Sequence, residues 1–238
     1  MKIYHGTSHL IARRAASFGL VPQGLKGKMG QFSSHPNMAY LTTTYALHFA
    51  CVPLNGVTHI SPEESKIAVI EIETDKLDKE KLYPDENFIC EIVRRQNPLP
   101  PTENHEKTLH SYVRANLDRY QGFWSESLQM LGNICYKGLV PVDAITRYVM
   151  FDLSKNNDLM NLDPITCTTN NAIVGQFYKQ FIAWLFDEVR ELPHVKEAID
   201  ILSHIEDKQS DMAIHFKKQI ELFKKLQRKR DGIKIINL

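Results

Sequence analysis

The sequence lacks most of the features that mark secreted, membrane-spanning or zinc-binding proteins. Only four of its 238 residues are cysteine, and they lie far apart without a Cys-x-x-Cys pair. We therefore expect a reduced chain with neither disulfides nor structural zinc. No apolar run approaches the roughly 18 residues of a membrane-spanning helix, and the first residues, MKIYHGTSHLIARRAAS, lack the apolar region of a signal peptide. These absences predict a cytoplasmic location.

An excess of charge of one sign is also absent. Twenty-nine Lys and Arg stand against 28 Asp and Glu, a formal net charge of +1, so the whole-chain charge favours neither nucleic acid nor a membrane surface as a partner. One stretch departs from this balance: KKQIELFKKLQRKR, residues 217–230, is strongly basic. A solvated helix face explains it most simply. Phosphate contacts to a nucleic acid and docking of an acidic inhibitor protein are the alternatives.

Hydrophobic periodicity predicts an α+β region in the first two thirds of the chain. In the helix expected at 8–19, Ser8 is the N-cap and Gly19 the stop, and the apolar side consists of Leu10, Ile11, Ala15 and Phe18. The predicted strands are 2–7, 38–43, 65–74 and two strands within 127–152, separated by a Gly-Leu-Val-Pro turn. The further predicted helices are 44–52, 88–95 and 103–120.

The composition changes after residue 155, where a polar, Asn-rich stretch predicts a linker over 156–171. Beyond it the pattern is helical, so we divide the chain into a domain at 1–155, the linker, and an all-α region at 172–238. The first tail helix is rich in aromatic residues, which favours core packing; if that surface were exposed, it would be a partner site. Its apolar face is Val174, Tyr178, Phe181, Leu185 and Val189.

The opening Ile-Tyr-His-Gly-Thr-Ser, residues 3–8, is the most informative short motif. A strand that presents His5 beside Gly6 lets another molecule approach the backbone. Downstream, Tyr40 begins a predicted strand in AYLTT, and Glu126 is expected to open another in ESLQMLG. An imidazole, a phenol and a carboxylate, each on a strand, are what a site that cleaves a dinucleotide would need.

These three blocks, YHGTS, AYLTT with YALHFA, and ESLQMLG with GLVPVDAI, resemble the ADP-ribosyltransferase superfamily in its His-Tyr-Glu branch. That branch includes the diphtheria-type toxins and the poly(ADP-ribose) polymerases, and the spacing of the first two blocks is also similar to small bacterial transferases of conflict systems. The resemblance covers about residues 1–152. It implies a split antiparallel β-sheet that binds NAD as a substrate, without a metal.

The resemblance also implies a role for each matching residue. His5 would hydrogen-bond the adenine-side ribose, the backbone of Gly6 would bind the nicotinamide carboxamide, and Tyr40 would stack on the nicotinamide ring. Glu126 would bind the nicotinamide ribose and stabilise the positive charge that develops as nicotinamide leaves. Further expected NAD contacts are Thr7, Thr42 and Phe49.

The sequence departs from the family pattern at two points. Many relatives that modify proteins carry Glu or Gln two residues before the catalytic Glu, where this chain has Trp124. The segment between Glu126 and the Gly-Leu-Val-Pro turn is also longer than in some relatives, so Gln129 is the nearest substitute. We therefore expect a mono-ADP-ribosyltransferase toxin of a toxin–antitoxin or phage-defence system, with nucleic acid preferred over protein as acceptor. The helical tail would bind a neutralising partner.

Several alternatives remain open from the sequence. The pairs His5/His9 and His105/His110 have no further ligand at helical spacing, so metal binding is disfavoured. The Gly-rich GLKGKMG, residues 24–30, does not form a P-loop, but Lys26 or Lys28 would lie near the pyrophosphate of NAD. Two other functions fit the same fold: an NAD-dependent RNA 2′-phosphotransferase, and a catalytically inactive module that binds ADP-ribose.

Overall fold

The computed structural model describes residues 1–22, 28–29, 32–33, 35–51, 54, 61–96, 105–155, 173–190, 221, 224–225, 230 and 232–238. Seven strands form one antiparallel sheet in the order β6-β7-β4-β1-β5-β8-β9, and β2 and β3 form a separate pair. The strands are β1 (Lys2–Ser8), β2 (Lys28–Met29), β3 (Phe32–Ser33), β4 (Met38–Thr42), β5 (Lys66–Glu73), β6 (Leu82–Pro84), β7 (Asn133–Lys137), β8 (Ile145–Asp152) and β9 (Ile233–Asn237). The helices are α1 (His9–Phe18), α2 (Ala46–Cys51), α3 (Glu86–Gln96), α4 (His105–Ala115), α5 (Trp124–Leu131) and α6 (Ile173–Leu185).

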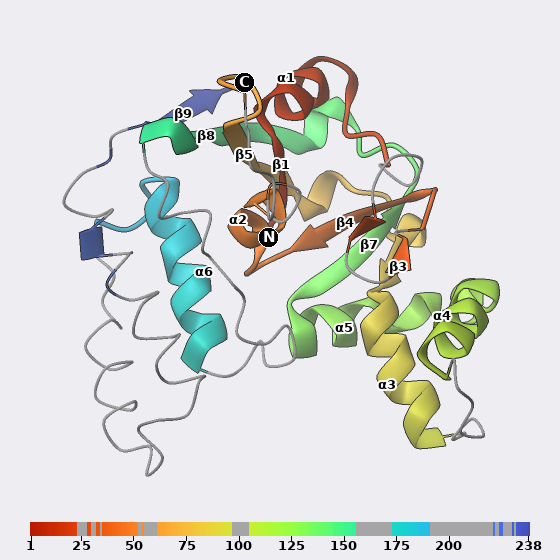
Figure 1. Ribbon diagram of the computed structural model, residues 1–238. Coiled ribbons are helices and arrows are strands. Elements are labelled where there is room, and N and C mark those ends of the chain that lie inside the picture. Colours follow the sequence, from red (N-terminus) through yellow and green to blue (C-terminus); the bar gives the residue numbers. More distant parts are fainter. Residues whose placement is uncertain are drawn as a thin grey trace, which may run out of the picture.

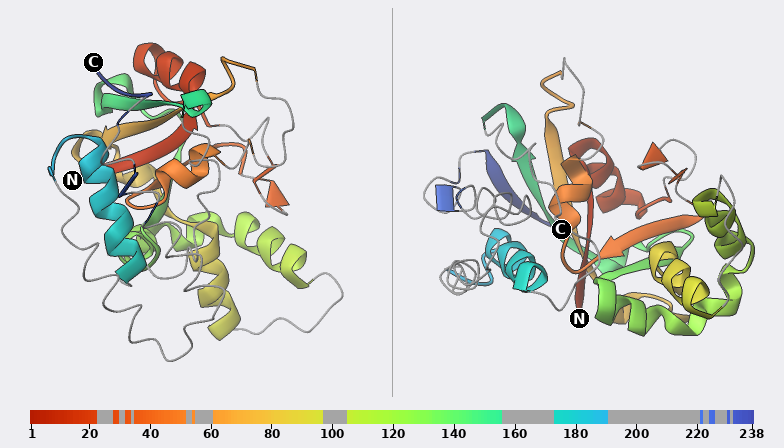
Figure 2. Two further views of the ribbon diagram at one scale, coloured as in Figure 1. Left: turned by 60° about the vertical axis from the view of Figure 1, so that its left-hand side comes forward. Right: turned by 60° about the horizontal axis from the view of Figure 1, so that its bottom comes forward.

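Helices cover both faces of the sheet, as expected for an α+β fold (Figure 1). Over the β1, β5 and β8 half, α1 packs on one face, and α2 and α6 pack on the other. Over the β4, β7 and β6 half, α5 lies on the α1 side, and α3 and α4 cover the opposite face. Figure 2 shows α6 and the α3–α4 pair at opposite ends of the sheet. Within the part of the chain that the structure describes, no helix is long and apolar enough to cross a membrane.

Helix α1 confirms the predicted caps and half of the predicted apolar side, since Ala15 is buried and Ile11 is partly buried against the sheet. The Ser8 hydroxyl accepts the Ile11 N–H at 3.3 Å, and Gly19 ends the helix with a positive φ of 84°. However, Leu10 and Phe18 are 57% and 75% exposed. The helix instead turns its alanines toward the sheet, because small side chains allow its backbone to lie close to β5 and β8. The buried alanines are Ala12 and Ala15.

The segment from 127 to 131 is helical, which corrects the strand predicted to begin near Glu126. Trp124, Leu128 and Leu131 recur at helical spacing, and Leu128 and Leu131 are buried. Leu128 and Trp124 pack into the cluster on the α1 side of the sheet. Gly132 then adopts a left-handed conformation with φ 71° and ends α5. The predicted strand is therefore shorter and starts at Asn133.

The C-terminal region is not purely helical. Strand β9 pairs with β8 from Arg147–Asn237 to Phe151–Ile233 and forms one edge of the sheet. Helix α6 confirms the predicted packing role of its aromatic face, since Tyr178, Phe181 and Trp184 are buried in the cluster that also contains residues of β1, β5 and β8. The predicted linker lies outside the described residues.

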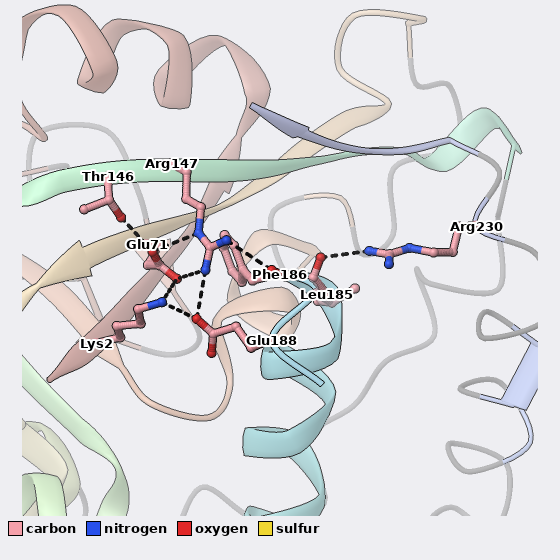
Figure 3. Close-up of polar contacts among 8 residues, drawn as sticks. All are labelled: Lys2, Glu71, Thr146, Arg147, Leu185, Phe186, Glu188 and Arg230. Atoms are coloured by element: carbon pink, nitrogen blue, oxygen red, sulfur yellow. Dashed lines mark hydrogen bonds and ion pairs between the residues drawn. The ribbon is translucent and has the colours of Figure 1, made fainter. Parts of the chain in front are cut away.

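An ion network around the buried Glu71 fastens the segment that follows α6 to the sheet (Figure 3). The Glu71 side chain on β5 is 2% exposed and receives a bidentate contact from Arg147 on β8, at 2.9 and 2.8 Å. Lys2 of β1 lies 3.2 Å from the same carboxylate. Arg147 also donates to the Phe186 carbonyl at 3.1 Å and to Glu188 at 2.8 Å. Each charge is thus paired, which offsets the free-energy cost of burying it.

Candidate functional site

The sheet opens between its two central strands. β1 pairs with β5 along its whole length, from Lys2 to Ser8, but pairs with β4 only through Tyr4–Thr42. In both Figure 1 and Figure 2, β1 and β4 run in clearly different directions. The sheet is therefore split next to that single pair. Continuing the antiparallel register past it would place Gly6 opposite Tyr40, so the two sequence blocks meet where the strands separate.

His5 bridges the split. It lies in the middle of β1, and its Nδ1 is 2.8 Å from the carbonyl oxygen of Tyr40. A carbonyl only accepts, so Nδ1 carries the hydrogen and Nε2 presents a lone pair. Among the described residues this Nε2 is buried without a hydrogen-bond partner. Burial lowers the pKa of His5 below its ordinary value, which keeps the ring neutral at pH 7.

The Tyr40 side chain leaves the sheet on the face opposite to His5. Residues alternate along a strand, and Tyr40 packs with Met38 and Cys135 under α3 and α4, whereas Ile3, with the parity of His5, packs with Leu41 on the other face. His5 therefore contacts Tyr40 through its backbone. The structure brings these two predicted residues together, but their rings do not stack.

The Tyr40 phenol is held by two hydrogen bonds that the sequence analysis does not anticipate. It accepts the backbone N–H of His35 at 2.8 Å and donates to Oε1 of Glu86, at the start of α3, at 3.1 Å. Burial, together with the negative charge of Glu86, raises the pKa of Tyr40 far above its ordinary value. The hydroxyl therefore stays protonated and remains a donor to the carboxylate.

Glu86 itself is held from α4. Its side chain is 9% exposed, and Nε of Arg114 lies 3.3 Å from Oε1, with a second contact of 3.3 Å from Nη2 to Oε2. Nδ1 of His110 is 3.9 Å from the same carboxylate. Arg114 and His110 lie one helical turn apart on α4, which places both on the side that faces Glu86. The result is a compact polar cluster of a phenol, a carboxylate and a guanidinium.

The remaining predicted NAD contacts have packing roles in the fold. A Cβ on Gly6 would lie 1.7 Å from the Ala46 carbonyl, so only glycine lets α2 pack this closely on β1. The Thr42 hydroxyl accepts the N–H groups of Thr44 and Tyr45, at 3.0 and 3.1 Å, where the chain turns into α2. Thr7 is buried, and Phe49 is partly buried against the α2–α6 cluster. None of these observations tests NAD binding.

Glu126 is an exposed residue in the first turn of α5, with its carboxylate accepting the Ser125 hydroxyl at 2.7 Å. This hydrogen bond lowers the pKa of Glu126. On the helical wheel it lies opposite Trp124 and Leu128, which face the sheet. The alternative, Gln129, is exposed as well. Glu126 is therefore on a helix and not on a strand, and its catalytic role stays a prediction.

The described part of the basic tail is engaged within the molecule. Arg230 lies over the Trp184 ring at 4.6 Å, donates to the Leu185 carbonyl at 2.9 Å and pairs with Asp187. Lys224 pairs with Glu221 at 2.7 Å. The other basic residues of this stretch lie outside the described residues, apart from Lys225. Lys26 of the Gly-rich segment also lies outside them, and only the backbone of Lys28 is described. Within the described residues, no group of three or more His, Cys, Asp or Glu could hold a metal ion.

Comparison with known proteins gives little beyond this geometry. No protein-family model matches the chain, and no curated protein matches it. Among solved structures the chain is similar to EcPltA, with 12% sequence identity and a TM-score of 0.37, over 65% of this chain and 78% of that chain. At this level of similarity, inferences about activity have to come from the site itself.

Proposed function

We propose that the chain is an NAD-dependent ADP-ribosyltransferase whose substrate binds where β1 and β4 separate. The observation that supports this most directly is the state of His5. Its Nδ1–H is fixed on the Tyr40 carbonyl, which leaves a buried lone pair on Nε2 without a donor among the described residues. An unsatisfied buried acceptor calls for a donor, and a ribose hydroxyl of NAD is such a group.

The proposed reaction breaks the bond between C1′ of the nicotinamide ribose and the nicotinamide nitrogen. The electron pair leaves with nicotinamide, positive charge develops on the ribose, and a nucleophile of the acceptor bonds to C1′ and gives up its proton. The chain contributes groups that orient the two halves of NAD and a carboxylate that stabilises this charge. In this proposal Tyr40 supplies the aromatic surface for nicotinamide, and Glu126 supplies the carboxylate, which requires α5 to bring it to the split from its exposed position on the α1 side of the sheet.

The first test is nicotinamide release from NAD by the purified protein. Substituting His5→Ala removes the acceptor, and we expect kcat/KM to fall by about 10- to 100-fold, the loss of a hydrogen bond worth roughly 1.5–3 kcal/mol in a buried site. His9→Ala, at the start of α1, is the matched control and should leave the rate unchanged. Equal rates for His5→Ala and the unaltered protein would contradict the proposed site.

The carboxylate is tested separately. Glu126→Gln should lower kcat by roughly 100- to 1000-fold if the charge of Glu126 acts on the transition state. Glu91→Gln, an exposed residue on α3 that pairs with Arg94, is the control. Retained activity in Glu126→Gln, together with loss in His5→Ala, would move the catalytic carboxylate to another residue and leave the binding site in place.

The proposal also includes the chemical class of the acceptor. We favour a nucleic acid, since Trp124 occupies the position of the second acidic residue in protein-directed relatives and packs against the sheet. Incubation with labelled NAD and separate RNA, DNA and protein pools identifies the acceptor by the pool that takes up label. Growth arrest on expression, relieved by His5→Ala, would support a toxin role.

Two other functions give different results in the same assays. An NAD-dependent RNA 2′-phosphotransferase releases nicotinamide only when 2′-phosphorylated RNA is present. A catalytically inactive ADP-ribose-binding module releases none, and Glu126→Gln leaves its affinity for ADP-ribose nearly unchanged. Nicotinamide release without RNA excludes both.

A further inference from the structure

The contacts of Glu86 go beyond what its place in the fold requires. Its carboxylate joins α3 to α4 through Arg114, and an exposed ion pair between neighbouring helices would achieve that. Instead the side chain is 9% exposed and accepts a hydrogen bond from Tyr40, a residue 46 positions earlier in the sequence, on the strand that separates from β1. The carboxylate therefore connects two helices to the edge of the proposed NAD site.

The phenol oxygen of Tyr40 has both its donor and its acceptor capacity used. Its hydrogen goes to Glu86 and a lone pair accepts from His35 N–H. Two hydrogen bonds at one end, and the backbone at the other, leave the ring little freedom to swing. A ring that is already fixed loses little conformational entropy when a ligand stacks on it.

From this geometry we propose that Glu86 is a positioning residue, which orients the Tyr40 ring for the nicotinamide half of NAD and is itself oriented by Arg114. The proposal rests on the proposed function. Glu86 is not assigned a chemical step, since its oxygens are already occupied by Tyr40 and Arg114. Its contribution is to binding, so its loss should raise KM for NAD and leave kcat nearly unchanged.

The test compares Glu86→Ala, Glu86→Gln and Tyr40→Phe by steady-state nicotinamide release. Glu86→Ala removes the acceptor, and we expect KM for NAD to rise by about five- to tenfold, as expected for losing preorganisation of one side chain. Glu86→Gln keeps a carbonyl oxygen that accepts from Tyr40, so it should recover most of the wild-type KM. Glu91→Ala, five residues along the same helix, is the control and should behave as wild type.

A double substitution separates positioning from a purely structural role. If Glu86 acts through the Tyr40 hydroxyl, Tyr40→Phe combined with Glu86→Ala should raise KM no more than Glu86→Ala alone. Additive effects of the two, or a Glu86→Gln variant as impaired as Glu86→Ala, would overturn the proposal and assign Glu86 to joining α3 with α4.

The proposed function and this proposal fail in different ways. If the unaltered protein releases no nicotinamide, both fall together. If it releases nicotinamide and His5→Ala is impaired, but Glu86→Ala matches Glu91→Ala in KM, only the positioning role is overturned. Thermal unfolding of each variant, measured alongside, ensures that KM is compared between folded proteins.

Discussion

At the scale of single residues, several side chains near the proposed site perform a packing role that the sequence alone could not separate from a binding role. Gly6 is the clearest case. Its place beside His5 favours a close approach by a ligand, and the structure shows that the approaching backbone on one side is that of α2. The contribution of the missing Cβ to this packing can be measured as the change in stability when a Cβ is added.

Gly6→Ala should destabilise the fold strongly. The new Cβ would lie 1.7 Å from the Ala46 carbonyl and 2.7 Å from the Ala50 nitrogen, so α2 must move away from β1. We expect the free energy of unfolding in urea to fall by about 2–4 kcal/mol, the upper end of overpacking effects. Gly122→Ala is the control, because nothing lies within 4 Å of the added Cβ. A Gly6→Ala protein as stable as Gly122→Ala would contradict this packing.

Asp85, which precedes α3, gives a pH-dependent prediction. Burial raises its pKa to about 6, from 3.8, so between these values the folded chain holds a proton that the unfolded chain has released. Stability is therefore lost as the pH rises through this window, by about 2–3 kcal/mol for a shift of roughly two units. Asp85→Asn cannot ionise and keeps an oxygen for the Asn87 N–H that Asp85 accepts at 2.9 Å.

The measurement is the free energy of unfolding at pH 4.5 and at pH 7 for both proteins. Asp85→Asn should be stabilised relative to the unaltered chain at pH 7 and much less so at pH 4.5. Asp78→Asn, an exposed cap that accepts the Glu80 N–H, controls for the substitution itself. An equal difference at the two pH values would show that Asp85 does not titrate as stated.

At the scale of secondary-structure elements, the sequence predicts those helices and strands whose signals lie within the element itself. The α1 caps, Ser8 and Gly19, and the β-branched run of β5 contain their own signals, and the structure confirms them. Trp124 and Leu128 have the local helical spacing of α5, whereas the predicted strand at Glu126 rests on the family resemblance. The sequence does not predict β9, because its short run of isoleucines follows a long helical pattern.

The residues of the candidate site also divide into those with a local sequence signal and those without one. His5 and Tyr40 were predicted because each lies in a short strand next to a distinctive neighbour, and β1 and β4 do bring them together. Glu86 could not be connected with Tyr40, since the pairing depends on how α3 folds back over β4. No spacing rule links two residues that meet only in the tertiary structure.

Among the contacts between secondary-structure elements, we expect the Glu71 network to have the largest effect on the free energy of unfolding. Burial alone would raise the pKa of Glu71, but the hydrogen bonds from Arg147 and Thr146 outweigh it and hold the pKa below its ordinary value. Glu71→Gln removes the bidentate carboxylate partner of Arg147 and leaves only the partly exposed Glu188 paired with it, so we expect a loss of about 3–5 kcal/mol in unfolding free energy at pH 7. Glu73→Gln, two residues along β5 and half-exposed, should cost less than about 1 kcal/mol.

Low pH should reduce the difference in unfolding free energy between the unaltered protein and Glu71→Gln. A carboxylate whose pKa is lowered in the folded state contributes stability above its unfolded pKa, and that stability is lost as the pH falls through the folded value. The gap between the unaltered protein and Glu71→Gln should therefore narrow below about pH 4. A gap that stays constant from pH 7 to pH 3 would mean that the charge of Glu71 contributes nothing.

At the scale of the whole molecule, the described strands of the two halves of the sheet meet at one residue pair and at the His5–Tyr40 hydrogen bond, while the C-terminal segment completes the larger half. The face formed by β1, β5 and β8 is buried by α2 and α6, with Tyr4 stacked on Phe186 at 5.3 Å. Phe186 lies just beyond α6, so the packing of Tyr4 in β1 depends on a residue from the last third of the chain.

The predicted domain boundary at residue 155 can therefore be tested by truncation. A fragment of residues 1–155 lacks α6 and β9, so it exposes the apolar face around Tyr4, Val69 and Val149 and leaves Glu71 and Arg147 without their C-terminal cover. We expect it to bind a hydrophobic dye, to lose near-ultraviolet circular dichroism and to unfold without a cooperative transition. Adding a peptide of residues 173–190 should restore part of the signal, because this segment supplies Phe181, Leu185 and Phe186 to the cluster. A fragment that unfolds cooperatively with native dichroism would instead establish 1–155 as an independent domain, with α6 and β9 as accessory elements.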